Sequence, residues 1–238
     1  MIETRDLTVT YDGRAVLRAV DLTVPDGGHI ALMGPSGCGK TTTLRMIGGF
    51  ETPDQGDILF LGERINDIPP HKRNINTVFQ RYALFPHLNV FENVAFPLRE
   101  QKLPRNEIEQ KVNEMLALVK LTGFERRNVT RLSGGQQQRV AIARALAPEP
   151  RLVIADEPVS ALDVSIQSQI LNLLIALARD LSLTMIFISH DLSVVHYIAD
   201  RIAVMRKGRI VEYGEADKVF SSPSHEYTQA LLAAVPRL

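Results

Sequence analysis

Two periodicities of apolar residues divide the chain into predicted strands and helices. In the first third, short apolar or alternating runs predict strands at 2–11, 16–24, 30–33, 56–61 and 76–79. Within the first run, Leu7, Val9 and Tyr11 fall on one face of an extended strand. Asp12-Gly13 predicts a tight turn, so the first two strands should pair as an antiparallel hairpin.

Three helices are predicted between residues 40 and 150. Residues 40–47 predict a short helix that ends at Gly48-Gly49, and apolar positions at helical spacing predict a second helix over 105–120. Ser133 predicts the N-cap of a third helix that runs to about residue 147. The stretch 86–150 is therefore predicted to be a helical insertion.

Strands and helices alternate again in the last third of the chain. Strands are predicted at 152–155, 185–188 and 202–205, and helices over 166–177 and 226–234. This alternation is typical of a parallel sheet covered by helices on both faces. We predict one α/β domain over 1–238. Its catalytic core, 1–85 and 151–238, includes an N-terminal antiparallel β subdomain, and 86–150 is the inserted helical subdomain.

Composition excludes some classes of protein. The 238 residues carry 27 basic and 27 acidic side chains, so no net charge favours a nucleic-acid partner. No apolar stretch approaches the ~18–20 residues of a membrane span, and the first residues are strand-like rather than a signal peptide. Cys38 is the single cysteine. We expect a cytosolic protein.

A glycine-rich loop between a predicted strand and a predicted helix is the first candidate site. Its residues are Gly34, Pro35, Ser36, Gly37, Cys38, Gly39, Lys40 and Thr41, with Thr42 following. Glycines let backbone N–H groups converge on a phosphate, and the helix N-terminus adds positive potential. We expect Lys40 to contact the β- and γ-phosphates of a nucleotide and Thr41 to bind Mg²⁺. A thiol reagent on Cys38 should block nucleotide binding, and the reaction requires that the thiol be accessible and partly ionised.

Asp156 and Glu157 end a predicted buried strand, where ligands bind in open α/β sheets. Asp156 is a candidate ligand of Mg²⁺, and Glu157 is a candidate base for a water that attacks the γ-phosphorus. The alternative is an ordinary acidic pair before a proline turn. The preceding phosphate loop favours the catalytic interpretation.

Three single residues are weaker candidates. Gln80 follows a predicted strand and could contact Mg²⁺ or the attacking water, although a surface glutamine is the simpler interpretation. His190 follows another strand and could contact the γ-phosphate, or it could cap or pack. Tyr11 could stack on adenine or simply pack. Residues alone leave these alternatives open.

A second anion site is predicted where Ser133, Gly134, Gly135 and Gln136 begin a helix. No phosphate loop lies close to it in sequence. The ATP of a partner subunit is the economical ligand.

Together these motifs resemble those of the ATP-binding cassette (ABC) ATPases over nearly the whole chain. The corresponding elements are the adenine-stacking Tyr11, Walker A at 34–41, the Q-loop Gln80, the signature at 132–136, Walker B at 152–156, the base Glu157, the D-loop from Ser160 to Asp163, and the switch residue His190. The resemblance implies a RecA-like P-loop NTPase that binds ATP and Mg²⁺. It also implies a head-to-tail homodimer or paired ATPase subunits, with each ATP between one Walker A and the other signature.

The same resemblance implies a membrane partner. Such a subunit lies peripherally on the inner face of the cell membrane. A groove beside Gln80 receives a permease helix, and a substrate-binding protein acts indirectly. The alternatives are a soluble ABC ATPase and a module that holds ATP without turnover. Lys40, Glu157 and His190 argue against the latter.

The subfamily resemblance is divided. Residues 1–147 resemble ATPases of polyamine (spermidine/putrescine) importers, most clearly at 48–53 and 70–87. Residues 148–238 resemble ATPases of oligopeptide and dipeptide importers. We interpret the chain as recombined or designed, with a natural mosaic as the alternative and an ATPase without a matched transporter as one consequence. Segment 81–97 favours a polyamine-type permease.

Overall fold

The computed structural model describes residues 1–80, 82–189 and 191–234. It contains two compact units. The first comprises Met1–Ile75 and Thr184–Leu238, and the second comprises Asn76–Leu183. The division of the chain that the sequence suggests, with one domain and a helical subdomain at 86–150, stays a prediction.

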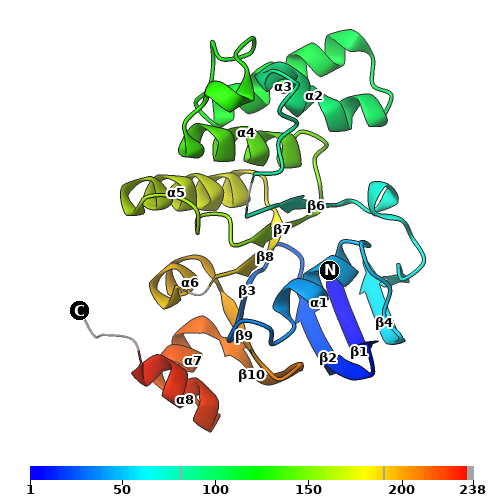
Figure 1. Cartoon of the computed structure of the whole chain (residues 1–238), viewed down its shortest axis with the longest axis vertical. Helices are drawn as coiled ribbons and strands as arrows, with labels where there is room; N and C mark the ends of the chain where they lie inside the picture. Colours follow the sequence, from blue (N-terminus) through cyan, green and yellow to red (C-terminus); the bar gives the residue numbers. More distant parts are fainter. Residues whose placement is uncertain (81, 190, 235–238) are drawn as a thin grey trace. The chain divides into compact units, whose positions relative to one another are not determined.

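An antiparallel sheet occupies the N-terminal part of the first unit (Figure 1). Its strands lie in the order β2-β1-β4-β5, with bounds β1 Ile2–Tyr11, β2 Arg14–Val24, β4 Gln55–Phe60 and β5 Glu63–Arg64. The predicted hairpin is confirmed. The prediction that Tyr11 shares a face with Leu7 and Val9 is wrong, because the latter two are buried and Tyr11 is 43% exposed. Register shifts on both sides of Val9 break the alternation.

Parallel strands form the second sheet of this unit. β3 (His29–Met33) pairs in parallel with β8 (Thr184–Ile188) and β9 (Arg201–Arg206). A further strand that the sequence did not predict, β10 (Arg209–Glu215), pairs antiparallel with β9 and so adds an antiparallel edge to the predicted parallel strands. Lys207 and Gly208 have φ of 49° and 78°, which suits a tight hairpin turn. The half-buried positions of β10 leave no continuous apolar run to detect.

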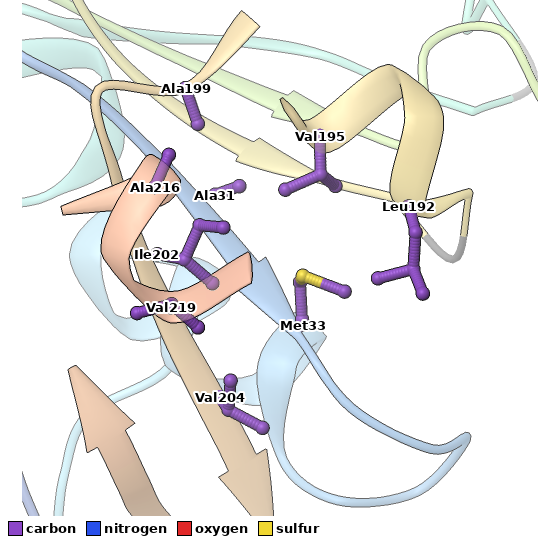
Figure 2. Packing of buried hydrophobic residues seen from close by; sticks show 9 residues of the cluster. All are labelled: Ala31, Met33, Leu192, Val195, Ala199, Ile202, Val204, Ala216 and Val219. Atoms are coloured by element: carbon purple, nitrogen blue, oxygen red, sulfur yellow. The ribbon is translucent and has the colours of Figure 1, made fainter. Parts of the chain in front are cut away.

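Short helices pack on these strands. Side chains of α6 (Leu192–Ile198) and α7 (Ala216–Ser221) meet those of β3 and β9 in the cluster of Figure 2. Tyr227, Leu231 and Leu232 of α8 (Glu226–Ala233) pack against it. Neither α6 nor α7 was predicted, because at most two turns carry little periodicity.

The phosphate-loop helix α1 (Lys40–Ile47) follows β3 after the glycine-rich loop, and its C-terminus is anchored by a buried arginine. Arg73, which follows the short helix η1 (Pro70–Lys72), donates from Nη1 to the carbonyl oxygens of Met46 and Ile47 over 2.8 and 2.7 Å. Burial lowers the pKa of Arg73. The guanidinium satisfies carbonyls that have no partner within the helix and complements their negative potential.

The second unit contains two neighbouring strands and most of the long helices (Figure 1). The strands are β6 Ile75–Val78 and β7 Leu152–Asp156, and the helices are α2 Val90–Glu100, α3 Arg105–Leu118, η2 Val129–Arg131, α4 Gly134–Leu146 and α5 Val164–Asp180. α2, α3 and α4 pack against one another. The sequence did not predict α2 separately, although the Asn89 side chain caps it by accepting from the N–H of Glu92.

Candidate functional site

In the first unit, the loop 34–39 joins β3 to α1 in a conformation that requires glycine. Gly34 and Gly39 have φ of 146° and 110°, and a Cβ on Gly34 would collide with the carbonyl oxygen of Met205. Pro35, Ser36 and Gly37 are exposed, as is Thr41 in the first turn of α1. The middle of the loop is therefore exposed to solvent, while Gly34 at its start is closely packed.

Lys40, the first residue of α1, extends its side chain back to the start of this loop. Its Nζ donates to the carbonyl oxygens of Gly34 and Pro35 over 2.8 and 3.0 Å. Among the described residues no side chain caps α1, so its first N–H groups remain available to an anion. A held ammonium, an uncapped helix N-terminus and exposed loop backbone fit a phosphate group. The exposed Thr41 hydroxyl is an oxygen donor of the kind that Mg²⁺ accepts.

Cys38 does not present an open thiol. It is 3% exposed, and Lys40 Nζ lies 3.7 Å from its Sγ. The predicted reaction with a thiol reagent requires an accessible thiol, and this conformation does not provide one. The side chain packs beneath the loop instead of facing solvent.

Tyr11 is connected to α1 through a carboxylate. Its hydroxyl donates to Glu51, and Arg45 of α1 forms an ion pair with Glu51 over 2.7 Å. Partial desolvation, and then the hydrogen bond to Glu51, raise the pKa of Tyr11 to about 12. The sequence gives no local signal of Glu51 as a partner of Tyr11, because the two residues are 40 positions apart.

In the second unit, Gln80 and Glu157 come together at the ends of β6 and β7. Gln80 Nε2 donates to Glu157 Oε2 over 2.9 Å and to Ser160 Oγ over 3.1 Å. Ser160 Oγ donates in turn to the carbonyl oxygen of Glu157. Glu157 has φ of 46°, which is uncommon for a residue with a side chain and often marks a functional site. Asp156 ends β7 and is partly exposed.

The predicted helix start at Ser133 is confirmed, and it forms a capping box. Ser133 Oγ accepts from the N–H of Gln136, whose side chain accepts from the N–H of Ser133. Gly134 and Gly135 also have a packing role: a Cβ on Gly135 would lie 2.6 Å from Cγ2 of Ile166. The sequence assigned these glycines only to anion binding. Close packing against Ile166, in the first turn of α5, requires Gly135 as well.

Asp163 and His190 complete the set of predicted residues. Asp163 is exposed at the N-cap position of α5, and its side chain makes no capping hydrogen bond within the described part of the chain. His190 lies outside the described residues.

A cavity of about 310 Å³ lies within the second unit. The segment after Gln80 forms one side of it, through Tyr82, Ala83, Leu84 and Pro86. Val129, Thr130 and Gln137 complete its lining. The cavity therefore adjoins both the Gln80 segment and the helix that begins at the signature.

Comparison with known families identifies the family to which these motifs belong. The family model "ABC transporter" matches residues 17–160, which include both the phosphate loop and Glu157. The chain belongs to the ABC transporter family. A second model, "Oligopeptide/dipeptide transporter, C-terminal region", matches residues 211–238.

Curated relatives of this ABC protein point to the polyamine group. The chain is 43% identical over 234 residues to "Spermidine/putrescine import ATP-binding protein PotA" of Clostridium novyi, covering 98% of this chain and 67% of that protein. It is 47% identical over 227 residues to the protein of the same name from Clostridium acetobutylicum, covering 95% of this chain and 64% of that one. The chain thus spans about two thirds of the length of these relatives. The predicted resemblance to both importer groups is confirmed.

Solved structures confirm the predicted fold class. A dimeric post-hydrolysis structure of the ATP-binding cassette MJ0796, bound to ADP and Pi, superposes with a TM-score of 0.81 at 32% identity, covering 91% of this chain and 99% of that one. The cbiO1 protein of Clostridium perfringens gives 0.85 at 31% identity, covering 93% and 90%. Among the described residues of this ABC protein, every helix is too short or too polar to cross a membrane.

Proposed function

We propose that this chain is the ATP-hydrolysing subunit of an importer, with polyamines favoured over peptides as the transported class. The observation that carries the proposal is the identity of 43–47% to spermidine/putrescine import ATP-binding proteins over nearly the whole chain. The match at 211–238 is the observation that favours peptides. It covers only the C-terminal residues.

The phosphate loop would hold the nucleotide. Lys40 and the first N–H groups of α1 bind the phosphates, and Tyr11 stacks on the adenine. Thr41, Asp156 and Gln80 offer oxygen ligands for Mg²⁺, which when bound neutralises phosphate charge. The loop geometry and the exposed Thr41 support this assignment.

Glu157 would be the general base. Its carboxylate accepts a proton from a water whose oxygen attacks the γ-phosphorus, and ADP leaves with the electrons of the broken bond. Gln80 holds the carboxylate by its side-chain amide, which supports the assignment. His190 is proposed to contact the γ-phosphate.

A second ATPase subunit would complete each site. We assign Ser133, Gly134, Gly135 and Gln136 to the partner's ATP, with Asp163 at the dimer interface. The dimeric MJ0796 structures support a dimer. The cavity beside Gln80 would receive a helix of a transmembrane permease. The subunit would then lie on the cytoplasmic face of the membrane. A substrate-binding protein would act indirectly, and no nucleic acid would be bound.

Uptake in two deletion strains tests the proposal. One strain lacks the ATPase subunit of a polyamine importer and the other that of a peptide importer, and each receives this chain. We expect rescue of labelled spermidine uptake and none with Lys40→Ala. Rescue of dipeptide uptake alone would reverse the substrate assignment. Purified protein that hydrolyses no ATP would overturn the enzymatic assignment.

A further inference from the structure

The backbone at Tyr82 and Ala83 adopts an unusual conformation where it lines the cavity of the second unit. Tyr82 and Ala83 both line the cavity, and they have φ of 57° and 47°. Two consecutive non-glycine residues in the left-handed backbone region are uncommon, and contacts with surrounding groups must stabilise them. Their carbonyl groups show which contacts do so.

Arg144, near the end of α4, holds both carbonyls. Its Nη1 donates to the oxygen of Ala83 over 2.7 Å, and its Nη2 donates to the oxygen of Tyr82 over 3.2 Å. Its Cζ also lies 5.4 Å from the ring centroid of Phe85. A planar guanidinium can hold two adjacent acceptors and cover a ring at once, which a lysine ammonium does not reproduce.

The rest of the segment is anchored separately. Asn93 of α2, which is fully buried, accepts from the N–H of Phe85 over 2.8 Å and donates to its carbonyl oxygen over 3.2 Å. Burial lowers the pKa of Arg144, but an arginine stays charged at neutral pH and therefore needs its acceptors. The segment is thus fixed between α2 and α4.

Arg144 and Tyr82 connect this segment to the signature. The Tyr82 hydroxyl oxygen lies 2.9 Å from the position that a Cβ on Gly134 would take. The hydroxyl end of the Tyr82 side chain therefore lies against the start of α4, and the Tyr82 carbonyl oxygen is held near the end of α4. Two positions earlier in the chain, Gln80 contacts Glu157.

We propose that Arg144 is a positioning residue that holds the backbone of Tyr82 and Ala83 against α4 and thereby keeps Gln80 aligned with Glu157. A displacement of this segment, which forms one wall of the cavity, is then transmitted both to α4 and to the side-chain amide of Gln80. The expected change in kcat rests on the proposed ATP hydrolysis. The contacts by which Arg144 holds Tyr82 and Ala83 do not depend on it.

Kinetics of three variants test the proposal. Arg144→Met keeps an apolar stem and removes both donors, and Arg144→Lys keeps the charge. Arg139→Met is the matched control, because Arg139 lies on the same helix but donates to the carbonyl of Val119 and to Gln169. We expect Arg144→Met to lower kcat about tenfold with KM for ATP changed less than about twofold, and Arg144→Lys to recover only part. Arg139→Met should change stability only.

A double-mutant cycle with Gln80→Ala separates positioning from general destabilisation. If Arg144 acts through Gln80, the double variant has the kcat of Gln80→Ala alone. If the two losses multiply, or if Arg139→Met behaves like Arg144→Met, the proposal is overturned.

A second measurement requires no turnover. The chain contains no tryptophan, so Leu84→Trp in the cavity wall provides a single reporter. Its fluorescence anisotropy should fall when Arg144→Met is added and not when Arg139→Met is added. Equal anisotropy in all backgrounds overturns the proposal. A parent protein without ATPase activity would defeat the proposed function, and this measurement would still decide the role of Arg144.

Discussion

The side-chain amide of Gln80 donates to the carboxylate of Glu157 over 2.9 Å, although the two residues are 77 positions apart. The bond joins the segment after β6 to the end of β7. Because the same amide also donates to Ser160, whose hydroxyl donates to the backbone carbonyl of Glu157, the Gln80 amide is held by a small network rather than by one contact. A side chain proposed to accept a proton from water is thus held by a residue beside the cavity.

Removal of this amide should slow hydrolysis without weakening nucleotide binding. For Gln80→Ala we expect kcat to fall about 10- to 100-fold, because a misplaced base loses alignment with its water. ATP affinity, measured by calorimetry, should stay within about twofold. Gln110→Ala on α3 also removes an exposed amide that bonds a carboxylate, Glu114, and should have no effect. A large loss of ATP affinity in Gln80→Ala would assign the residue to binding.

Glu157→Gln should abolish proton transfer and retain nearly the same volume. We expect turnover to fall by about 10²–10⁴ and an ATP-bound dimer to accumulate in gel filtration. Glu100→Gln, at the exposed end of α2, is the control. A Glu157→Gln variant that stays monomeric and hydrolyses ATP like the parent contradicts the assignment of the base.

Gly135→Ala should destabilise the protein through a steric contact. The added methyl would lie 2.6 Å from Ile166 Cγ2, which we expect to cost about 1–3 kcal/mol, against a gain in helix propensity of about 1 kcal/mol. Adding Ile166→Leu removes that methyl group and should recover much of the lost free energy of unfolding, measured by urea denaturation. Recovery of stability without recovery of ATPase activity would separate the packing role of the glycine from its role toward ATP.

Gln138 should be replaceable by an apolar residue with a gain in stability. Its side chain is fully buried on α4, and neither amide atom has a hydrogen-bond partner among the described residues. Because such an unsatisfied amide costs about 1–3 kcal/mol, Gln138→Leu should raise the melting temperature by about 2–12 °C. Gln110→Leu, at an exposed position, should not. A lower melting temperature in Gln138→Leu would mean that the amide is satisfied in solution.

Alkaline titration should report the contact between Tyr11 and Glu51. The difference in ultraviolet absorbance between the parent and Tyr11→Phe should titrate near pH 12 rather than near the ordinary value of 10.0. Since the folded-state pKa is raised, the stabilisation is present below about pH 10 and is lost as the pH rises towards 12. Glu51→Gln should lower the Tyr11 pKa only partly, because desolvation is the larger cause. An unchanged pKa in Glu51→Gln would exclude the contact.

The motifs that join adjacent residues were predictable because their chemistry is local. The phosphate loop needs glycines, a lysine and a following helix in direct succession, and the structure places all three as predicted. Ser133 and Gln136 form a capping box within four residues, so the start of α4 was also predictable.

Contacts between distant segments were not predictable in this way. The sequence suggested a ligand role for Gln80, but its bond to Glu157 exists only because β6 and β7 are neighbours. Arg144 carried no motif that assigns it to the backbone of Tyr82 and Ala83. The burial of Cys38 depends likewise on packing beneath the loop, which the sequence does not show.

The sequence by itself therefore determined the family, the fold class and the identity of most candidate residues, because these follow from short-range spacing and local backbone requirements. Only the tertiary structure decided which side chain orients Glu157, what holds the cavity wall, and why Gly135 must lack a side chain. Those relationships depend on which elements pack together, and packing joins residues whose separation along the chain leaves no periodic signal.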